Sequence, residues 1–455
     1  MIAVGFLLLL VLIALAFAAG GSGTALPVGQ LLVLTALFLL FFGAGVYIAA
    51  VLGVLGLIAG LAYSNRPFWD FVGSILWGPS TNFILVAVPL FLLMGEIMLR
   101  AGLSEKLYRS LNLWLNRMPG GLLHTNVVSC GVFSAVAGSS VATAATMGSV
   151  ALPYFRRTAY DPRMVLGSLA AGGALGNLVP PGITFLLYGL ITETSVGELY
   201  LAAVGPSLLV ILLFIGVILV HGLRHPLPKP ASVPLGTKLV SLVDLIPTLL
   251  LILVVLGTIY AGLATPTESA ALGVAGALVA AWLAGRLTFA MVHESVVATA
   301  RTTAMIGLII FGAYLLNYVL ASLGFPQMLA QAIAGIPVPG WVLMALIIGF
   351  YLALGTFMEG FSMIITTIPV IFPIVKQLGY DPVWFGVVVT MLVEIAMISP
   401  PDGTVLYVLQ GMRKDRGSIS DIFIGVLPFV GVYIIAIFIL MAAPQIALWL
   451  PQAVH

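Results

Sequence analysis

The chain contains two matched interruptions of apolar sequence, NLVPPG at residues 177–182 and ISPPDG at residues 398–403. Proline lacks a backbone N–H and its ring clashes with the preceding helical turn, so neither stretch can continue as a regular α-helix. Each break therefore leaves carbonyl groups without helical partners. In hydrocarbon such groups are tolerated where they line a cavity or bind a ligand. A kink satisfied by neighbouring Ser or Thr hydroxyls is the structural alternative, but two matched double prolines favour a ligand.

The two breaks belong to a longer internal repeat, in which each pair of matching residues is 220 positions apart, as in 400 − 180. The matching elements are Pro153 and Pro373, Tyr160-Asp161-Pro162 and Tyr380-Asp381-Pro382, Pro180-Pro181 and Pro400-Pro401, and Thr184 and Thr404. Paired halves that each contain a broken helix are typical of secondary transporters with a central binding site. The repeat therefore predicts a transporter.

The composition places the chain in a membrane. Of its 455 residues, 62% are hydrophobic and 7% are charged, and the mean hydropathy is +1.22. Apolar runs of the ~20 residues that span a bilayer recur along the chain, so we expect roughly a dozen membrane segments. Runs such as 208–220 and 249–260 are apolar on every face, which favours helices over a β-barrel. The first twenty residues lack a basic start, so we expect a membrane helix there and no signal peptide.

The loop charges predict that the two copies of the repeat cross the membrane in opposite senses. Basic residues cluster before the first break and after the second, and cytoplasmic loops carry an excess of Lys and Arg. The Pro-rich linker 221–238 is also basic, so we expect it in the cytoplasm as the joint between inverted halves. The prediction rests on Arg156, Arg157 and Arg163, on Arg413, Lys414 and Arg416, and on Arg224, Lys229 and Lys238 in the linker.

Each break is preceded by a short segment of small residues, SAVAGSSVAT at 134–143 and GTFMEGFS at 355–362. Both interrupt apolar runs that are too short to cross a membrane twice. We interpret them as the tips of re-entrant helical hairpins, where glycine permits the turn and hydroxyls and helix ends offer ligands. Close helix packing through small residues is the alternative, and the pairing of each segment with a break favours the hairpin.

Several further motifs carry a family resemblance from about Leu37 to the C-terminus. In order they are LFLLMGEIMLRAGLSEKLYRSL at 90–111, GSSVATAATMG at 138–148, AYDPR at 159–163, the first PPG break, TPTESAALG at 265–273, GYDPVWFGV at 379–387 and SPPDGTVLYVLQG at 399–411. In this order and spacing the chain resembles the large membrane subunit, DctM-like, of tripartite ATP-independent periplasmic (TRAP) transporters.

The resemblance implies an all-α integral membrane protein: an elevator-type transporter with inverted-topology repeats, two re-entrant hairpins and two broken transmembrane helices. It implies sodium-coupled uptake of a small organic acid or related solute across the bacterial inner membrane, with no cofactor besides the coupling ion. The implied partners are a small DctQ-like membrane subunit and a DctP-like periplasmic substrate-binding protein. We expect scaffold helices and an arm helix at 1–117, the first transport repeat at 118–200, scaffold helices with the linker and a second arm at 201–340, the second transport repeat at 341–420 and a C-terminal transmembrane helix at 421–455. The charged stretches that match the family's arm helices are Ser104–Arg117 and Phe289–Arg301.

The family's site residues can be carried over by motif. One sodium site would use Ser139, Ser140, Thr143, Gly176, Val179 and Pro181, and a second would use Gly355, Met358, Gly360, Thr366, Ile398 and Pro401. Substrate would lie between the hairpin tips, near Asn177, Thr184, Glu359, Ser399, Asp402 and Thr404. Many ligands would be carbonyl oxygens, which suit a hard cation. Glu359 and Asp402 would repel an anionic substrate, so they either support ion binding or indicate a substrate with a cationic group.

The remaining acidic residues are weaker candidates. Glu96, Glu268 and Glu394 all lie in apolar surroundings, where an ionisable residue is a functional candidate by default. Glu96 can pair with Arg100 one turn later, and Glu268 follows a Thr-Pro-Thr helix start, so we expect structural roles for these two.

Other function classes find little support in the sequence. His293-Glu294 lacks the second histidine of a zinc protease motif, and the chain has no P-loop, so we expect neither an enzyme nor an ATP-driven pump. The net charge of +2 gives no indication of a nucleic-acid partner. Two rivals remain open: a stand-alone ion-coupled carboxylate carrier, and a channel, for which the scarcity of intramembrane charge gives little support.

Overall fold

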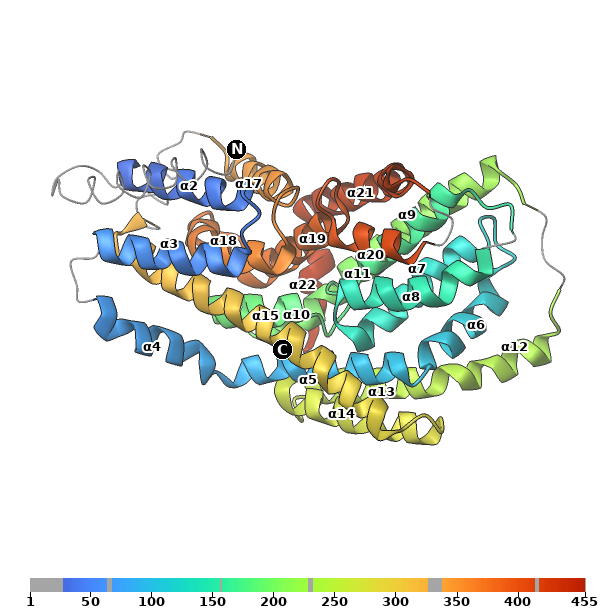
Figure 1. The fold of residues 1–455 in the computed structure, drawn as a ribbon. Helices are drawn as coiled ribbons and strands as arrows, with labels where there is room; N and C mark the ends of the chain where they lie inside the picture. Colours follow the sequence, from blue (N-terminus) through green and yellow to red (C-terminus); the bar gives the residue numbers. More distant parts are fainter. Residues whose placement is uncertain are drawn as a thin grey trace.

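The chain folds into a long bundle of α-helices, shown in Figure 1 as a computed structural model that describes residues 28–63, 68–155, 158–227, 232–325, 338–413 and 417–454. Within these ranges every regular element is a helix. The predicted helix in the first twenty residues lies outside them, as do Arg156, Arg157, Lys229, Lys414 and Arg416. The helices of the first half are α2 (Val28–Gly43), α3 (Ile48–Tyr63), α4 (Phe68–Ser80), α5 (Phe83–Arg100), α6 (Leu103–Leu115), α7 (Leu122–Ala137), α8 (Ser140–Phe155), α9 (Pro162–Gly173), α10 (Ile183–Thr192) and α11 (Val196–Arg224). Those of the second half are α12 (Leu235–Ser241), the short 3₁₀ turn η1 (Leu242–Leu245), α13 (Ile246–Tyr260), α14 (Pro266–Leu283), α15 (Phe289–Ser322), α17 (Gly340–Leu354), α18 (Gly360–Gln377), α19 (Pro382–Ile398), α20 (Thr404–Met412), α21 (Ile419–Ala442) and α22 (Gln445–Val454).

The two hairpins and the two broken helices are present as predicted. Helices α7 and α8 are joined by a two-residue turn, where Gly138 has a φ of 59°, a conformation that favours glycine. Residues 355–359 form the corresponding turn between α17 and α18. Residues 174–182 interrupt the path from α9 to α10, and residues 399–403 interrupt the path from α19 to α20. The predicted fold class is confirmed.

The repeat seen in the sequence is also a repeat of structure. Helix α18 begins 220 residues after α8 (360 − 140), and α19 begins 220 residues after α9 (382 − 162). The Tyr-Asp-Pro turns explain the second match, because each aspartate caps the helix that follows. Asp161 accepts a hydrogen bond from Arg163 N at 3.0 Å, and Asp381 accepts one from Val383 N at 2.8 Å. The proline comes next in each turn, where the helix needs no N–H donor.

The two halves of the repeat interlock through their broken helices. Helix α10 of the first half packs on α18 of the second hairpin, and α20 of the second half packs on α8 of the first hairpin. Helix α10 also contacts α19, where Tyr188 Oη donates a 2.7 Å hydrogen bond to the carbonyl oxygen of Pro382. The eight helices α7–α10 and α17–α20 thus depend on one another for their packing.

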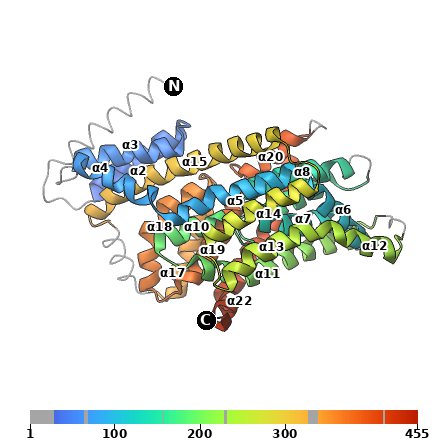
Figure 2. The same ribbon diagram turned by 90° about the horizontal axis from the view of Figure 1, so that it is seen from below.

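The remaining helices form long pairs around this core. Helix α3 lies along α15, and α5 lies between α15 and α14 (Figure 2). At the α3–α15 contact, a Cβ on Gly312 would lie 2.7 Å from Ala49 O, so the absence of a side chain lets the two backbones approach closely. The structural roles expected for two acidic residues are confirmed: Glu96 pairs with Arg100 at 3.4 Å, and Glu268 forms a capping box with Thr265.

Seven of the described helices are long and apolar enough to cross a membrane. The hairpin arms α7 and α17 and the half-helices are shorter, down to the nine residues of α20, because re-entrant and broken elements do not cross the bilayer alone. The expected dozen segments exceed the seven helices of this length in the described residues, and shorter apolar helices of 10–17 residues account for most of the difference. One of the seven, α18, is an arm of the second hairpin, and the other six together with the re-entrant elements fit a multi-pass integral membrane protein.

Three boundaries differ in detail from the expected division. The predicted second arm, Phe289–Arg301, is the first part of the 34-residue helix α15 and is not a separate element, whereas the first arm agrees with α6. The boundary drawn at residue 200 falls inside α11. The C-terminal region holds the short helix α22 in addition to α21.

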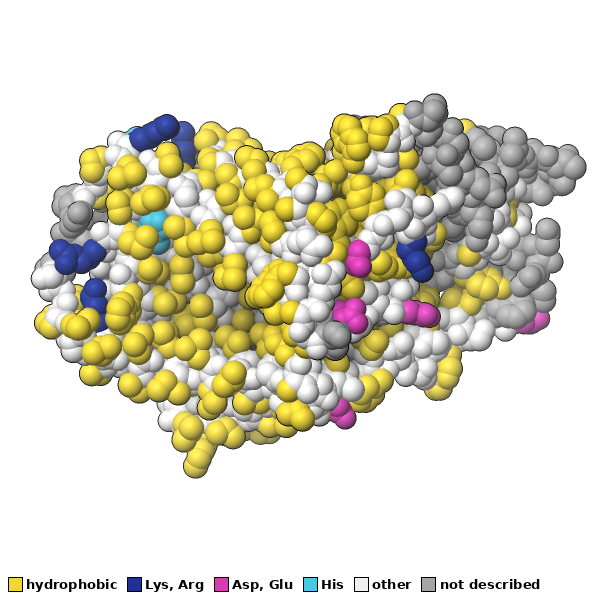
Figure 3. Space-filling view, turned by 180° about the vertical axis from the view of Figure 1, so that it is seen from behind, with side chains coloured by type: hydrophobic (Ala, Val, Ile, Leu, Met, Phe, Trp, Pro, Cys, Tyr) yellow, Lys and Arg dark blue, Asp and Glu magenta, His cyan; other side chains and the backbone are white. Residues whose placement is uncertain are grey.

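Charge is distributed unevenly along the bundle. On the face shown in Figure 3, Lys and Arg side chains lie mainly at the end that carries α6 and α12, and Asp and Glu side chains lie in the other half. An excess of basic residues marks the cytoplasmic side of a membrane protein. By this rule we expect the end with α6 and α12 on the cytoplasmic side.

Candidate functional site

The tip of the first hairpin lies directly against the first broken helix. A Cβ on Gly176 would overlap the backbone of Ser140, so only glycine permits this approach. On the other side of the turn, Ile183 N donates a 3.3 Å hydrogen bond to the carbonyl oxygen of Gly138. The structure thus brings together the predicted first-site residues Ser139, Ser140 and Gly176, with Pro181 O near Gly138.

A buried carboxylate from the other half of the chain completes this cluster. Glu394 of α19 has no exposed surface, and both of its oxygens lie 2.7 Å from Ser140 Oγ. Asn177 N donates to Glu394 Oε1 at 3.0 Å, and Asn177 Nδ2 donates to Ser140 Oγ at 2.9 Å. Asn177, expected near the substrate, therefore lies with the predicted ion ligands.

Several oxygen atoms in this region have no hydrogen-bond partner among the described residues. Two are side-chain atoms of fully buried residues, Thr143 Oγ1 and Asn177 Oδ1. The backbone hydrogen bonds of the break end on other carbonyls, which leaves those of Gly176, Val179 and Pro181 without a donor in the described chain. Over the same residues, no group of three His, Cys, Asp or Glu side chains is placed to hold a metal ion. The donor set is hydroxyl, amide and carbonyl oxygen, which suits a hard monovalent cation better than zinc or copper.

The second hairpin tip packs on the last turns of α19. A Cβ on Gly355 would lie 2.7 Å from Ala396 Cβ, and one on Gly360 would lie 2.5 Å from Val393 Cγ1. This places both glycines close to the end of α19, where Ile398 is buried. Met358 is buried in the same turn.

Two other predicted ligands of the second site make different contacts. Thr366 Oγ1 donates to Ser362 O at 2.7 Å within α18. The carbonyl oxygen of Pro401 accepts a 2.7 Å hydrogen bond from Tyr407 Oη. Among the described residues, neither Thr366 nor Pro401 is hydrogen-bonded to the turn of the second hairpin. The second cluster is therefore less complete than the first.

Glu359 caps the second helix of its hairpin. Its Oε2 accepts hydrogen bonds from Ser362 N at 3.0 Å and from Ser362 Oγ at 3.1 Å. A carboxylate is favoured at this position because the helix N-terminus carries a partial positive charge. Glu359 therefore already occupies the N-terminus of α18.

The other predicted substrate residues differ in exposure. Thr184 is fully buried, and its hydroxyl has no partner in the described part of the chain. Thr404 Oγ1 lies 3.1 Å from Met397 Sδ, and the carbonyl of Ser399 accepts from Gly403 N at 2.9 Å. Asp402 is exposed. No hydrogen bond among the described residues joins these four side chains into one site.

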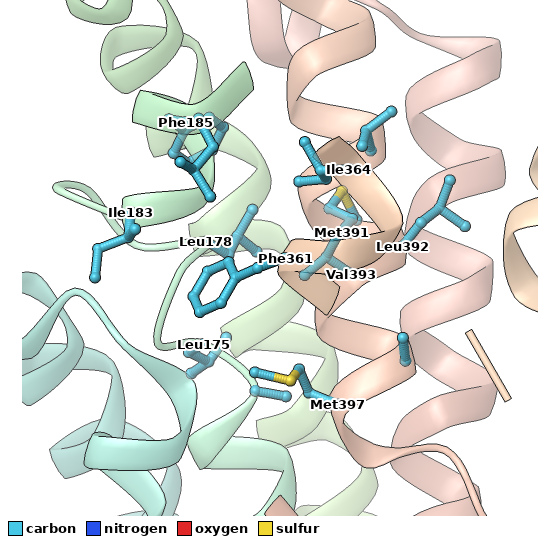
Figure 4. Packing of buried hydrophobic residues seen from close by; sticks show 14 of the residues in the cluster. Leu175, Leu178, Ile183, Phe185, Phe361, Ile364, Met391, Leu392, Val393 and Met397 are labelled. Carbon is cyan, nitrogen blue, oxygen red and sulfur yellow. The ribbon is translucent and has the colours of Figure 1, made fainter. Parts of the chain in front are cut away.

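An apolar layer surrounds the polar cluster. Figure 4 shows Leu175 and Leu178 of the first break on the side toward Phe361 and Met397 of the second half, and all four are buried. Low exposure around the cluster excludes water and strengthens the electrostatic interactions inside it.

A separate cavity of about 520 Å³ opens between the long helices and the core, next to α4, α5, α10, α15 and α18. Its polar lining includes Asn82, Glu193, Tyr314 and Asn317. None of the predicted substrate residues lines it. It lies at the C-terminal end of α10, next to Leu190 and Glu193.

Residues 9–446 match the family model described as the DctM component of the tripartite ATP-independent periplasmic transporter. The chain belongs to the DctM family. It is a transport permease of the inner membrane and not an enzyme. The chain is 33% identical over 378 residues to the C4-dicarboxylate TRAP transporter large permease protein DctM of Pseudomonas aeruginosa, a match that covers 83% of this chain and 88% of the relative.

A second relative has a longer chain than this DctM-family permease. The isethionate TRAP transporter permease protein DctMQ of Oleidesulfovibrio alaskensis is 29% identical over 419 residues, which cover 92% of this chain and 66% of the relative. Among solved structures, the Alcanivorax borkumensis YdaH transporter has a similar fold, with a TM-score of 0.60 at 18% identity over 92% of this chain and 99% of that chain. This likeness concerns the fold alone.

Glu394 is the site residue of this DctM-family permease that sequence reasoning did not place. From the sequence alone, Glu394 is a functional candidate by default, because it is an acidic residue in apolar surroundings. A usable signal existed, because Glu394 lies four residues before Ile398, about one helical turn from the second break. The partners of Glu394 come from the first half, more than 210 residues away, so the repeat pattern alone could not reveal them.

Proposed function

We propose that this DctM-family permease takes up a small organic acid or related solute by sodium-coupled secondary transport. In this proposal an elevator movement carries solute and ions across the membrane, and a DctP-like periplasmic binding protein delivers the solute. A small DctQ-like membrane subunit completes the transporter. The coupling ion is the only cofactor required.

The observation that carries sodium coupling is the set of buried oxygens at the first break. A buried polar oxygen without a partner costs roughly 1–3 kcal/mol, and this cluster holds several within a short segment. A cation bound by Thr143 Oγ1, Asn177 Oδ1 and the carbonyls of Gly176 and Val179 would satisfy them together. Sodium suits such ligands because it is a hard cation and needs no thiolate or imidazole.

The packing of the core supports the elevator movement. Helices α7–α10 and α17–α20 interlock across the repeat, so they would move as one body. The contact of the core with α5 includes a close approach of small residues, since a Cβ on Gly95 of α5 would lie 2.9 Å from Ala137 Cα of α7. At this contact few large side chains would have to be displaced by a sliding movement.

Two acidic residues near the second break, and the substrates named for the relatives, bear on the class of substrate. Glu359 is engaged as the cap of α18, which supports a positioning role for it. Asp402 is exposed beside the break and remains able to meet a cationic group. The relatives transport a C4-dicarboxylate and isethionate, which are both small organic anions, so a small organic acid is the first class to test.

The decisive experiment is solute uptake into proteoliposomes. The permease is reconstituted with its small subunit and tested with and without the binding protein, under a sodium gradient and under an equal potassium gradient. Uptake that requires sodium, the small subunit and the binding protein would support the proposal. Uptake by this chain alone would instead indicate a stand-alone carrier, and non-saturable flux without sodium would indicate a channel.

A matched pair of variants tests the ion site itself. Thr143→Val removes a hydroxyl proposed to bind sodium, whereas Thr390→Val removes an equally buried hydroxyl that only donates to Gly386 O at 2.9 Å within α19. We expect Thr143→Val to raise the sodium concentration for half-maximal uptake about tenfold, and Thr390→Val to leave it unchanged. Equal sodium dependence in both variants would contradict the assignment of Thr143.

A further inference from the structure

We infer that Glu394 supplies the negative charge of the first sodium site, acting as a positioning residue from the opposite half of the chain. The inference rests on the proposed sodium coupling. Glu394 is fully buried on α19, and it contacts the two residues that bring the first hairpin and the first break together, Ser140 and Asn177.

The directions of the hydrogen bonds agree with a charged carboxylate. Ser140 has one hydroxyl proton, and because its oxygen accepts from Asn177 Nδ2 at 2.9 Å, that proton is directed to Glu394. Asn177 N–H is the second donor to the same carboxylate, at 3.0 Å. An ionised carboxylate only accepts hydrogen bonds, so both donors match it.

The orientation of the Asn177 amide also determines which oxygen atoms are left without a hydrogen-bond partner. Asn177 uses its amide nitrogen for Ser140, so its Oδ1 is left unpartnered in the described chain, together with Thr143 Oγ1. Glu394 thus holds Ser140 and Asn177 so that the remaining oxygens are available to a cation. A group that orients metal ligands in this way tunes affinity without touching the ion.

The charge of Glu394 has no compensating side chain in the part of the chain that the structure describes. The ion pairs there join Arg100, Arg109, Arg163 and Arg413 to other acidic residues, and none involves Glu394. A buried charge without a partner is strongly destabilising. A cation bound among the adjacent unpartnered oxygens would neutralise it, which would make sodium binding and folding of this region mutually favourable.

The same helix also reaches the second hairpin. Val393 and Ala396, on either side of Glu394, pack on Gly360 and Gly355. Ordering Glu394 by a cation at the first site therefore also orders the surface on which the second hairpin tip rests. The two halves of the site would respond to one ion together.

The test is the thermal unfolding of the permease with its small subunit in detergent, titrated with sodium chloride at constant ionic strength against choline chloride. Glu394→Gln removes the charge and keeps the oxygen that accepts from Ser140 and Asn177. We expect the sodium concentration for half-maximal stabilisation to rise roughly 10- to 100-fold. The unfolding temperature in choline should not fall. The control is Glu268→Gln, at an exposed helix cap, which should leave the titration unchanged.

Each other outcome has a distinct meaning. A Glu394→Gln protein with the sodium titration of the unmodified chain would overturn the inference and leave sodium coupling intact. An unmodified chain that sodium does not stabilise would overturn sodium coupling, and the inference with it. If Glu394→Gln does not fold, Glu394→Asp, which keeps the charge, must retain a sodium response, and a folded Glu394→Asp protein without one would overturn the inference.

Discussion

Gly176 is the residue at which the first site depends most directly on the absence of a side chain. Its backbone lies against Ser140, and a methyl group there would overlap Ser140 N and Cα. We expect Gly176→Ala to lower the free energy of unfolding by about 1–3 kcal/mol, because backbone atoms of the hairpin tip must move. Thermal unfolding in detergent measures this change.

Gly307 provides the matched control for that substitution. It lies inside α15, and a Cβ there would meet nothing within 4 Å. Alanine is favoured over glycine in a helix by about 1 kcal/mol, so Gly307→Ala should preserve or raise the unfolding temperature. Equal effects of the two substitutions would show that the hairpin tip is not tightly packed against the break.

At the scale of single residues, the sequence predicted which side chains are unusual but not all of their contacts. Ser140 and Gly176 were grouped by resemblance, and the structure brings them together. Asn177 was assigned to the substrate, yet its hydrogen bonds go to Ser140 and Glu394. Such contacts depend on how distant segments pack, and spacing within one segment carries no information about that.

At the scale of helices, the contact between α15 and α18 is one place where a surrounding helix meets the core of α7–α10 and α17–α20. Asn317 Nδ2 of α15 donates to Ile365 O of α18 at 3.4 Å. If the core moves as an elevator, this contact must break in each cycle. In a Cys130→Ser background, we expect a bis-methanethiosulfonate reagent that links Asn317→Cys to Ile365→Cys through disulfide bonds to abolish uptake, and a reducing agent to restore it.

A second cysteine pair controls for the chemistry of cross-linking. Thr258 of α13 and Ser269 of α14 have hydroxyl oxygens 2.9 Å apart, and both helices belong to the predicted scaffold. Joining Thr258→Cys to Ser269→Cys should leave uptake intact. Undiminished uptake with the 317–365 pair joined would rule out movement of α18 against α15.

The sequence predicted helix breaks and hairpin turns well because both have local causes. Double prolines stop a helix wherever they occur, and Asp161 and Asp381 cap the next helix through their own side chains. The division of long helices was less predictable. Phe289–Arg301 looks like a separate charged helix, but nothing in the sequence breaks it from the apolar part of α15.

At the scale of the whole molecule, the basic residues define an orientation that can be measured. The span Leu235–Tyr260 begins at the basic end and ends at the loop 261–264. In the Cys130→Ser background, we expect a membrane-impermeant thiol reagent outside intact cells to label Leu263→Cys and not Thr237→Cys. Both positions are exposed in the structure. Labelling in inside-out vesicles should show the reverse pattern, and the opposite result in both preparations would invert the orientation.

The cluster around Glu394 has no counterpart at the matching positions of the other half. The position 220 residues earlier (394 − 220) holds Ala174, and the positions matching Ser140 and Asn177 in the second half (140 + 220, 177 + 220) hold Gly360 and Met397. A dimer of two first halves would have the hydroxyl and the amide without the carboxylate. A dimer of two second halves would have the carboxylate without either donor. Two copies of either present-day half would therefore lack this cluster, and the contacts of Glu394 with Ser140 and Asn177 require two halves of different sequence.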